Sequence, residues 1–409
     1  MTRPGPAARG RGIPSVRGFW TARRAPLWLV TAAVLAWLPL LTMPARHWTD
    51  FASLYAAGKL AFTPQLADLH PVINYETTHG LAPTPFLYPP ALALVYVPFT
   101  WLPYGLAAAI HVILQAAALL GAAVLGSRLY GIPRRWAILG TLAWSPAVAG
   151  VISGQNSAVL LLLAMMAAAG LSGGRWRLAG VALGAAAYRP QQGVPLIGLA
   201  AWRGSWRPVA IAGGLVLVQY GLSVLATGGL LSWPAHWVAS IVSETAIDFQ
   251  AVGWQALSLP GLLGRLSVNG SAEGALLGPA LVGYVIGGLV IMGALRPLRT
   301  WDAPGAVALA CALALFAGPR GWSYDGTMLL PAVAVLARDA GSIRRPWAHG
   351  WLLAGAYALA LSWPVGVLIG VNPEAAVVLA APFVLLRWGP FSRLALASAR
   401  GSVDALRGG

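Results

Sequence analysis

Apolar runs long enough to cross a membrane recur along this chain, and they constrain its fold more than any other feature. Residues 27–43, 105–125, 209–226 and 275–294 are examples, and each approaches the ~20 residues that span a hydrocarbon core of ~30 Å. Charged residues make up 9% of the chain, whereas they make up roughly a quarter of a soluble domain. The pattern predicts an all-α polytopic membrane protein.

The net charge of +16 does not indicate a nucleic-acid-binding protein. Its basic residues lie in short tracts between the apolar runs, and no stretch is polar enough to form a soluble basic groove. We therefore place the tracts on the cytoplasmic side, by the positive-inside rule. The heavy use of Arg, Ala and Gly suggests a bacterial source, and hence its plasma membrane.

This threading predicts twelve spans with both termini in the cytoplasm. It gives a disordered tail at 1–25, a transmembrane domain at 26–390 and a cytoplasmic tail at 391–409. The two long external loops are 44–104 and 228–275, whereas the cytoplasmic turns are too short for a nucleotide-binding domain. The expected spans are 26–43, 105–127, 136–151, 157–171, 178–188, 190–202, 208–227, 276–295, 303–317, 326–338, 347–370 and 374–390.

The first external loop should contain helices that lie in the membrane interface. Apolar and aromatic residues between 51 and 62 recur at helical spacing, and a second segment, 88–102, is short and bounded by prolines. Asp50 precedes the first of these helices. Either Asp50 or Thr49 is simply the N-cap of that helix, or Asp50 is a general base whose basicity partial burial increases. Lys59 either snorkels to the interface or contacts a phosphate.

Three further polar motifs fall at external turns. Tyr88-Pro89-Pro90 opens a helix, since Pro is favoured in the first turn. Gln155 and Asn156 either cap the next span or bind sugar hydroxyls in a polar cavity. Arg189, followed by Pro190 and Gln191, lies between two short spans. It is expected to bind an anion beside a helix N-terminus or to pair with a carboxylate such as Asp325.

The last external turn, 318–325, combines charge with aromatic rings. Arg320 could contact a phosphate, and Trp322 and Tyr324 could stack on a sugar. Asp325 either caps the following helix or adds a second carboxylate to the site. The six histidines are scattered, so we expect neither a metal nor a cofactor.

These motifs together resemble glycosyltransferase family 87 of the GT-C superfamily. Asp50-Phe51 with Tyr55-Ala56-Ala57, then Tyr88-Pro89-Pro90, Gly154-Gln155-Asn156, Arg189-Pro190, and Tyr324-Asp325 with Leu329-Leu330-Pro331 carry the resemblance, in order, across roughly 30–390. Several members have His near the position of Tyr324-Asp325, and this chain departs from them there. The resemblance implies a GT-C-like fold, Asp50 as the base and Arg189-Pro190 as the family's basic-residue–proline element.

The resemblance also implies an activity. It predicts an inverting transfer of a sugar, with mannose as the first expectation, from a polyprenyl-phosphate donor to a lipid or glycan acceptor at the external face. The site residues expected are Asp50 as the base, Arg189, Lys59 and Arg320 at the phosphate, and Tyr88, Gln155, Asn156, Gln191, Trp322, Tyr324 and Asp325 at the sugar or acceptor. The alternatives are a lipid-sugar flippase or small-solute transporter, and an accessory subunit. The sequence names no protein partner.

Overall fold

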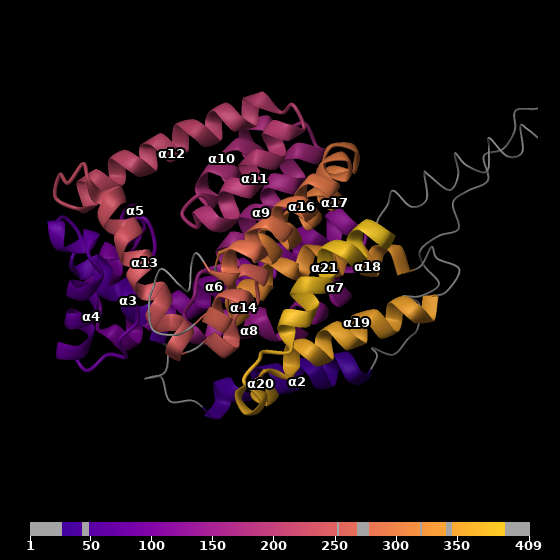
Figure 1. Cartoon of the computed structure of the whole chain (residues 1–409), viewed down its shortest axis with the longest axis horizontal. Coiled ribbons are helices and arrows are strands. Elements are labelled where there is room, and N and C mark those ends of the chain that lie inside the picture. Colours follow the sequence, from indigo (N-terminus) through magenta and orange to yellow (C-terminus); the bar gives the residue numbers. More distant parts are fainter. Residues whose placement is uncertain are drawn as a thin grey trace, which may run out of the picture.

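Helices account for all the regular secondary structure in the part of the chain that the computed structural model describes (Figure 1). That part comprises residues 27–42, 49–251, 253–267, 278–319, 321–340 and 346–388. The α-helices are α2 Leu27–Thr42, α3 Thr49–Lys59, α4 Leu69–Thr78, α5 Ala91–Tyr96, α6 Tyr104–Tyr130, α7 Arg134–Ala143, α8 Ser145–Ser153, α9 Ser157–Ser172, α10 Trp176–Ala186, α11 Pro190–Trp202, α12 Trp206–Ala226, α13 Trp233–Ala251, α14 Leu259–Gly264, α16 Pro279–Thr300, α17 Ala303–Ala317, α18 Leu330–Ala340, α19 Pro346–Leu361, α20 Trp363–Ile369 and α21 Glu374–Trp388. The 3-10 helices are η2 Pro64–Ala67, η3 Val97–Trp101, η4 Gly253–Gln255, η5 Arg265–Ser267 and η6 Ser323–Leu329.

The prediction of an all-helical membrane protein is confirmed at this level, and every expected span contains helix. Three helices in the described ranges are long and apolar enough to cross a membrane by themselves: α6, α12 and α16. The bent pair α7–α8 would make a fourth. The remaining expected spans coincide with shorter helices, so the full set of twelve stays a prediction. Both predicted tails lie outside the described residues.

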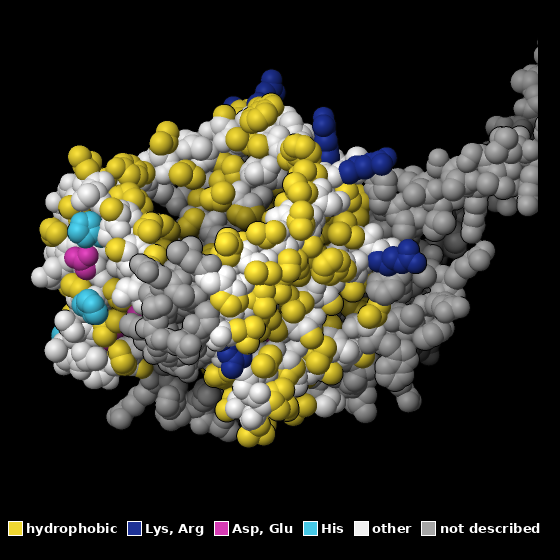
Figure 2. Space-filling view, in the orientation of Figure 1, with side chains coloured by type: hydrophobic (Ala, Val, Ile, Leu, Met, Phe, Trp, Pro, Cys, Tyr) yellow, Lys and Arg dark blue, Asp and Glu magenta, His cyan; other side chains and the backbone are white. Residues whose placement is uncertain are grey.

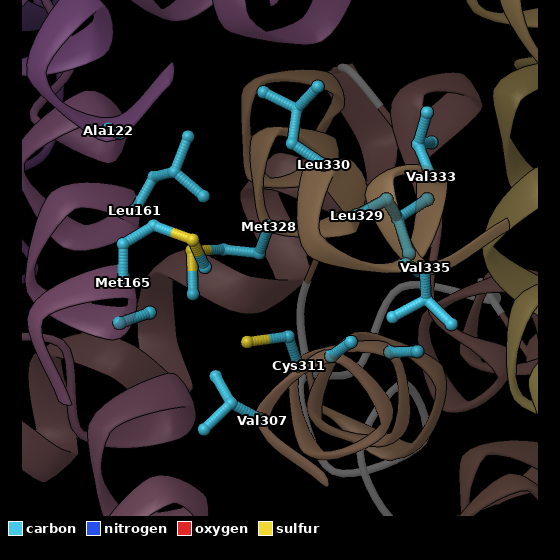
Figure 3. Packing of buried hydrophobic residues seen from close by; sticks show 14 of the residues in the cluster. Ala122, Leu161, Met165, Val307, Cys311, Met328, Leu329, Leu330, Val333 and Val335 are labelled. Carbon is cyan, nitrogen blue, oxygen red and sulfur yellow. The ribbon is translucent and has the colours of Figure 1, made fainter. Parts of the chain in front are cut away.

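Helix α17 is the centre of the main hydrophobic core. Nearly every residue from Ala303 to Phe316 is buried, as expected for a helix that is apolar all round. Its neighbours are α16 and α18, which flank it in sequence, and α9, α11 and α21, which come from distant parts of the chain. Figure 3 shows Val307 and Cys311 of this helix facing Met165 of α9 and Met328 of η6. These contacts hold α9 and η6 against α17.

A proline explains the bend of 64° between α7 and α8. Pro146 has no N–H, so it cannot continue the hydrogen-bond ladder of α7. The carbonyl of Leu142, which that N–H would have bonded, instead accepts a hydrogen bond from Nε1 of Trp37 in α2 (3.0 Å). At the bend itself, Nε1 of the fully buried Trp144 donates to the carbonyl of Gly326 in η6 (2.9 Å). The bend therefore brings α8 against η6.

The expected helices of the first external loop are present, as α3 and as α5 with η3. Helix α3 is buried along its whole length from Phe51 to Gly58, against α4, α5 and η3. Its spacing predicted burial of one face only, whereas neighbouring loop segments cover the others. The position of these helices in the membrane interface stays a prediction. The same end of the molecule carries α13 from the second long loop (Figure 1).

Candidate functional site

The site is built around Arg189, which lies at the break between α10 and α11. Helix α10 ends at Ala186 and α11 begins at Pro190, whose fixed φ suits a first helical turn. A Cβ added to Gly193 would lie 2.8 Å from the Cα of Ala187, so only glycine lets α11 fold back this closely. The break holds the Arg189 side chain inside the protein, where it is 3% exposed.

Side chains from three other segments surround the Arg189 guanidinium. Nη1 donates to Oδ1 of Asp325 (2.5 Å), and Nη2 donates to the hydroxyl of Tyr88 (2.9 Å) and to Oε1 of Gln155 (2.5 Å). The rings of Tyr88 and Tyr324 lie 5.5 Å from the guanidinium carbon, within the range of cation–π attraction. The expectation that Arg189 pairs with Asp325 is thus confirmed. Its phosphate-binding role stays a prediction.

The turn before α18 fixes Asp325 from the opposite side. Oδ2 of Asp325 accepts the backbone N–H of Trp322 (3.1 Å), while Oδ1 is bound to Arg189. The carboxylate therefore caps η6 and neutralises the buried Arg at the same time. Its role as a second carboxylate toward the substrate stays a prediction. Trp322 itself is buried and packs near Ala256, and Tyr324 is half-buried beside the guanidinium.

Asp50 enters the cluster through a close approach between α3 and the α8–α9 turn. Gly154 of that turn has φ +79°, and a Cβ placed on it would lie 2.6 Å from the Cβ of Phe51. This contact brings the half-buried Asp50 carboxyl to Gln155 and Ser153, which hydrogen-bond to it. Burial raises the pKa of Asp50 from 3.8 to about 6, and the hydrogen bonds and the charge of Arg189 oppose that shift.

The remaining predicted residues differ in how close they come to this cluster. Asn156 is buried, and its backbone carbonyl accepts a hydrogen bond from the Tyr188 hydroxyl (2.8 Å). Gln191 is exposed on α11, whereas its neighbour Gln192 is buried. Lys59 is exposed at the far end of α3, with its Nζ 5.7 Å from the ring of Tyr55. Arg320 lies outside the described residues.

Sequence reasoning missed several residues of the cluster. Ser153 and Tyr188 are direct neighbours of predicted motifs, so motif adjacency was the available signal. His111 lies within α6, where its Nε2 is 2.8 Å from the carbonyl of Gly154 and so steadies the turn that meets α3. Its position within an apolar run gave no indication of that contact. Within the described ranges, no group of three or more His, Cys, Asp or Glu side chains could hold a metal ion.

The arrangement combines two chemical functions in one buried cluster. A carboxyl with a pKa near neutrality can accept a proton from a hydroxyl at physiological pH. A fixed guanidinium supplies positive charge to a developing anion. Nε of Arg189 is buried and has no partner among the described residues, so part of that positive charge is not committed to protein groups.

Comparison with known proteins assigns the sequence to a family. The sequence model of glycosyltransferase family 87 matches residues 86–319, more than half of the 409-residue chain. The chain is 28% identical over 364 residues to a polyprenol-phosphate-mannose-dependent alpha-(1-2)-phosphatidylinositol pentamannoside mannosyltransferase of Mycolicibacterium smegmatis, covering 85% of this chain and 82% of that protein. A protein of the same description from Mycobacterium tuberculosis is 27% identical over 384 residues, covering 89% and 81%.

No solved structure matches this chain. The family assignment therefore rests on the sequence. The family match includes Tyr88, Gln155 and Arg189, whose side chains meet in the cluster. The helical architecture agrees with the membrane character expected of such an enzyme. This chain belongs to glycosyltransferase family 87 and is a membrane glycosyltransferase.

Proposed function

We propose that this protein transfers mannose from a polyprenyl-phosphate donor to a lipid or glycan acceptor at the external membrane face. The observation that carries the proposal is the position of the Asp50 carboxyl against Gln155, whose side chain also contacts the buried Arg189. The relatives are described as using polyprenol-phosphate-mannose and a phosphatidylinositol pentamannoside. That description supports the choice of donor and suggests a mannosylated lipid as the first acceptor to test.

In this mechanism Asp50 acts as the general base. Its carboxylate takes the proton of the acceptor hydroxyl, and the hydroxyl oxygen forms a bond to the anomeric carbon. The bond from that carbon to the phosphate oxygen breaks, and its electron pair leaves with the phosphate. One displacement inverts the anomeric centre. A pKa of about 6 keeps most of the Asp50 population ionised at neutral pH while leaving it basic enough to accept the proton.

Arg189 stabilises the departing phosphate. Its Nε is the donor that the described protein groups leave free, and the N-terminus of α11 beside it adds a positive dipole end. Two of its nitrogens are fixed by Asp325, Tyr88 and Gln155, so the guanidinium needs little reorganisation when the phosphate charge develops. Lys59 and Arg320 are kept as further proposed phosphate contacts.

The polar and aromatic residues around Arg189 would bind the transferred sugar and the acceptor. Tyr88, Gln155 and Asn156 supply hydrogen-bonding groups, and Tyr324 and Trp322 supply rings for stacking. Gln191, exposed on α11, and Asp325 complete the proposed set. The scheme uses no metal or other cofactor, since Arg189 and the N-terminus of α11 supply the positive charge for the departing phosphate.

The proposed membrane placement has about twelve spans in the 26–390 domain, with interfacial helices in the 44–104 loop and both termini in the cytoplasm of a bacterium. The charge distribution supports this placement. On the face that Figure 2 shows, most Lys and Arg side chains lie at one end of the molecule, near the α11–α12 turn and the C-terminal ends of α16 and α18. The few visible acidic side chains and the His side chains lie over the opposite end, which carries α3 and α4. Such asymmetry is expected of a membrane protein with its basic end inside.

The lipid tail of the donor has a candidate path between helices. Figure 2 shows the same face hollowed beneath α12, between the α5–α13 side and α10–α11, with hydrophobic side chains around the hollow. Helix α12 is itself largely exposed, and Leu217 and Val218 are 73% and 54% exposed. An apolar hollow between helices suits a prenyl chain, whose burial gives about 0.8 kcal/mol per CH₂.

Sugar transfer in membranes tests the proposal. Membranes with the wild-type protein or Asp50→Asn are given radiolabelled polyprenyl-phosphate-mannose, and label is followed into lipid and glycan. Asp68→Asn is the matched control, because Asp68 is an exposed carboxylate of the same loop. We expect transfer by wild type and Asp68→Asn only, at equal protein abundance. Equal transfer by Asp50→Asn would remove Asp50 as the base, and label moved across the bilayer without transfer would favour a flippase.

A further inference from the structure

Glu76 is a buried carboxyl of the first external loop that the proposed mechanism does not use. It lies on α4 and is 0% exposed. Its Oε2 accepts the backbone N–H of Thr84 (2.9 Å), whereas its Oε1 is buried and has no partner among the described residues. A carboxyl buried with one oxygen unsatisfied is costly, so its position calls for a functional explanation.

Glu76 anchors one end of segment 81–90, which connects α4 to α5. Four prolines leave this segment few backbone N–H donors, and two of those donors bond to Glu76. The side chain of Glu76 accepts the N–H of Thr84, and its backbone carbonyl accepts the N–H of Leu81 (2.8 Å). At the other end, the N–H of Ala91 donates to Oγ of Ser223 in α12 (3.0 Å). The segment is therefore held at both ends, and Tyr88 lies between the anchors.

We propose that Glu76 is a positioning residue, which in its neutral form holds segment 81–90 against α4 and so places Tyr88 beside Arg189 and Gln155. The inference rests on the proposed function, since it deepens the account of the same site. Tyr88 is the only residue of segment 81–90 for which the described contacts include one to Arg189. A shift of the segment would therefore loosen the cluster without removing any of its members.

The surroundings of Glu76 favour its neutral form. Burial raises its pKa from 4.5 to about 8, and the hydrogen bonds from Thr84 oppose that shift without cancelling it. The charged and titratable groups that face it are Asp50 from α3, whose negative charge also raises its pKa, and Tyr104 at the start of α6. No described Lys, Arg or His forms an ion pair with it.

These facts give the segment a pH dependence with a definite sign. When segment 81–90 packs against α4 (the closed arrangement), Glu76 keeps its proton up to a pH of about 8. When the segment moves away and exposes Glu76 to solvent (the opened arrangement), Glu76 releases its proton near its ordinary pKa of 4.5. The opened form therefore binds fewer protons between these values, so rising pH favours opening by about tenfold per unit in that window. Above a pH of about 8 the effect levels off.

Amide hydrogen exchange of the purified full-length protein tests the proposal without depending on transfer activity. In wild type, protection of peptides covering 81–90 should fall by about tenfold per pH unit between pH 5 and pH 8. Glu76→Gln, which keeps an acceptor but cannot ionise, should show constant protection. Asp68→Asn should follow wild type, and peptides from α12 should not respond. Wild-type and Glu76→Gln peptides that respond alike would overturn the proposal.

Transfer activity separates this inference from the proposed function. Wild-type transfer should fall as the pH rises towards about 8 and level off above it, and Glu76→Gln should lack that alkaline fall while matching wild type at the acid end of the window. Glu76→Ala should lose about tenfold, and combined with Tyr88→Phe it should lose little more than Tyr88→Phe alone. An unchanged alkaline fall in Glu76→Gln sinks the inference but not the transferase. If no transfer is found, but protection depends on pH in wild type and not in Glu76→Gln, the transferase proposal fails and the positioning role stands.

Discussion

Replacement of Gly154 by Ala tests whether the contact between α3 and the α8–α9 turn sets the position of Asp50. An Ala Cβ at this position would lie 2.6 Å from the Cβ of Phe51 and 3.0 Å from its backbone N. Carbon atoms in contact prefer separations of about 3.5 Å or more. Helix α3 would therefore have to retreat by about 1 Å, and Asp50, the residue before Phe51, would move with it.

Gly131→Ala is a matched control, because it imposes the same backbone strain without the collision. Gly131 has φ +66° and Gly154 has φ +79°, and a Cβ on Gly131 would meet nothing within 4 Å. Left-handed backbone costs a non-glycine residue about 1–2 kcal/mol at either position. Both variants should thus lose similar stability from strain, and only Gly154→Ala should disturb the site.

The assay is initial transfer rate in membranes, divided by the amount of folded protein in each preparation. A misplacement of about 1 Å at a reacting group costs about 100-fold in rate. We expect a loss of that order in Gly154→Ala and no more than about threefold in Gly131→Ala. If the transfer rate of Gly154→Ala were within threefold of that of Gly131→Ala, the reasoning that this close approach positions the base would be refuted.

Three further predictions concern the acid–base group, the ion pair and the absence of metal chemistry. Since Asp50 must be ionised to act as a base, kcat/KM should fall as the pH drops through about 6, and Gln155→Ala should move this limb to higher pH by removing a hydrogen bond that lowers the pKa. Arg189→Ala leaves Asp325 buried without its partner, which should destabilise the protein by about 3–5 kcal/mol; Arg189→Ala with Asp325→Ala should recover part of that loss in thermal unfolding in detergent. Dialysis against EDTA should leave the transfer rate within twofold, and a loss restored by added Mg²⁺ or Mn²⁺ would contradict a metal-independent mechanism.

Local chemistry was sufficient to predict many of the elements. Pro190 in the first turn of α11 and the proline-bounded segment before α6 gave helix boundaries that the structure reproduces. Helical spacing after Asp50 predicted α3. By contrast, the bend between α7 and α8 was not predicted, because a single Pro in an apolar run does not reveal whether another helix will satisfy the freed carbonyl. Trp37, more than a hundred residues away, does so here.

The candidate site shows the same division. Each motif was visible by itself, and Arg189 with Asp325 was recognised as one of two arrangements. Whether the two side chains meet depends on the position of η6 relative to α11, and both of these elements pack against α17. The burial of Glu76 was not predicted, because it arises from loop segments that pack over α4, and no local sequence pattern indicates that packing.

The sequence by itself determined that this chain enters a membrane, that its helices alternate with polar turns, and which residue types could carry transfer chemistry. These properties follow from hydropathy, proline positions and charge, which act over a few residues. Only the tertiary structure decided that Asp50, Gln155, Arg189 and Asp325 share one cluster, and that the pKa of Asp50 rises to about 6. Such properties depend on burial and on distances between segments far apart in the chain, and packing alone sets both.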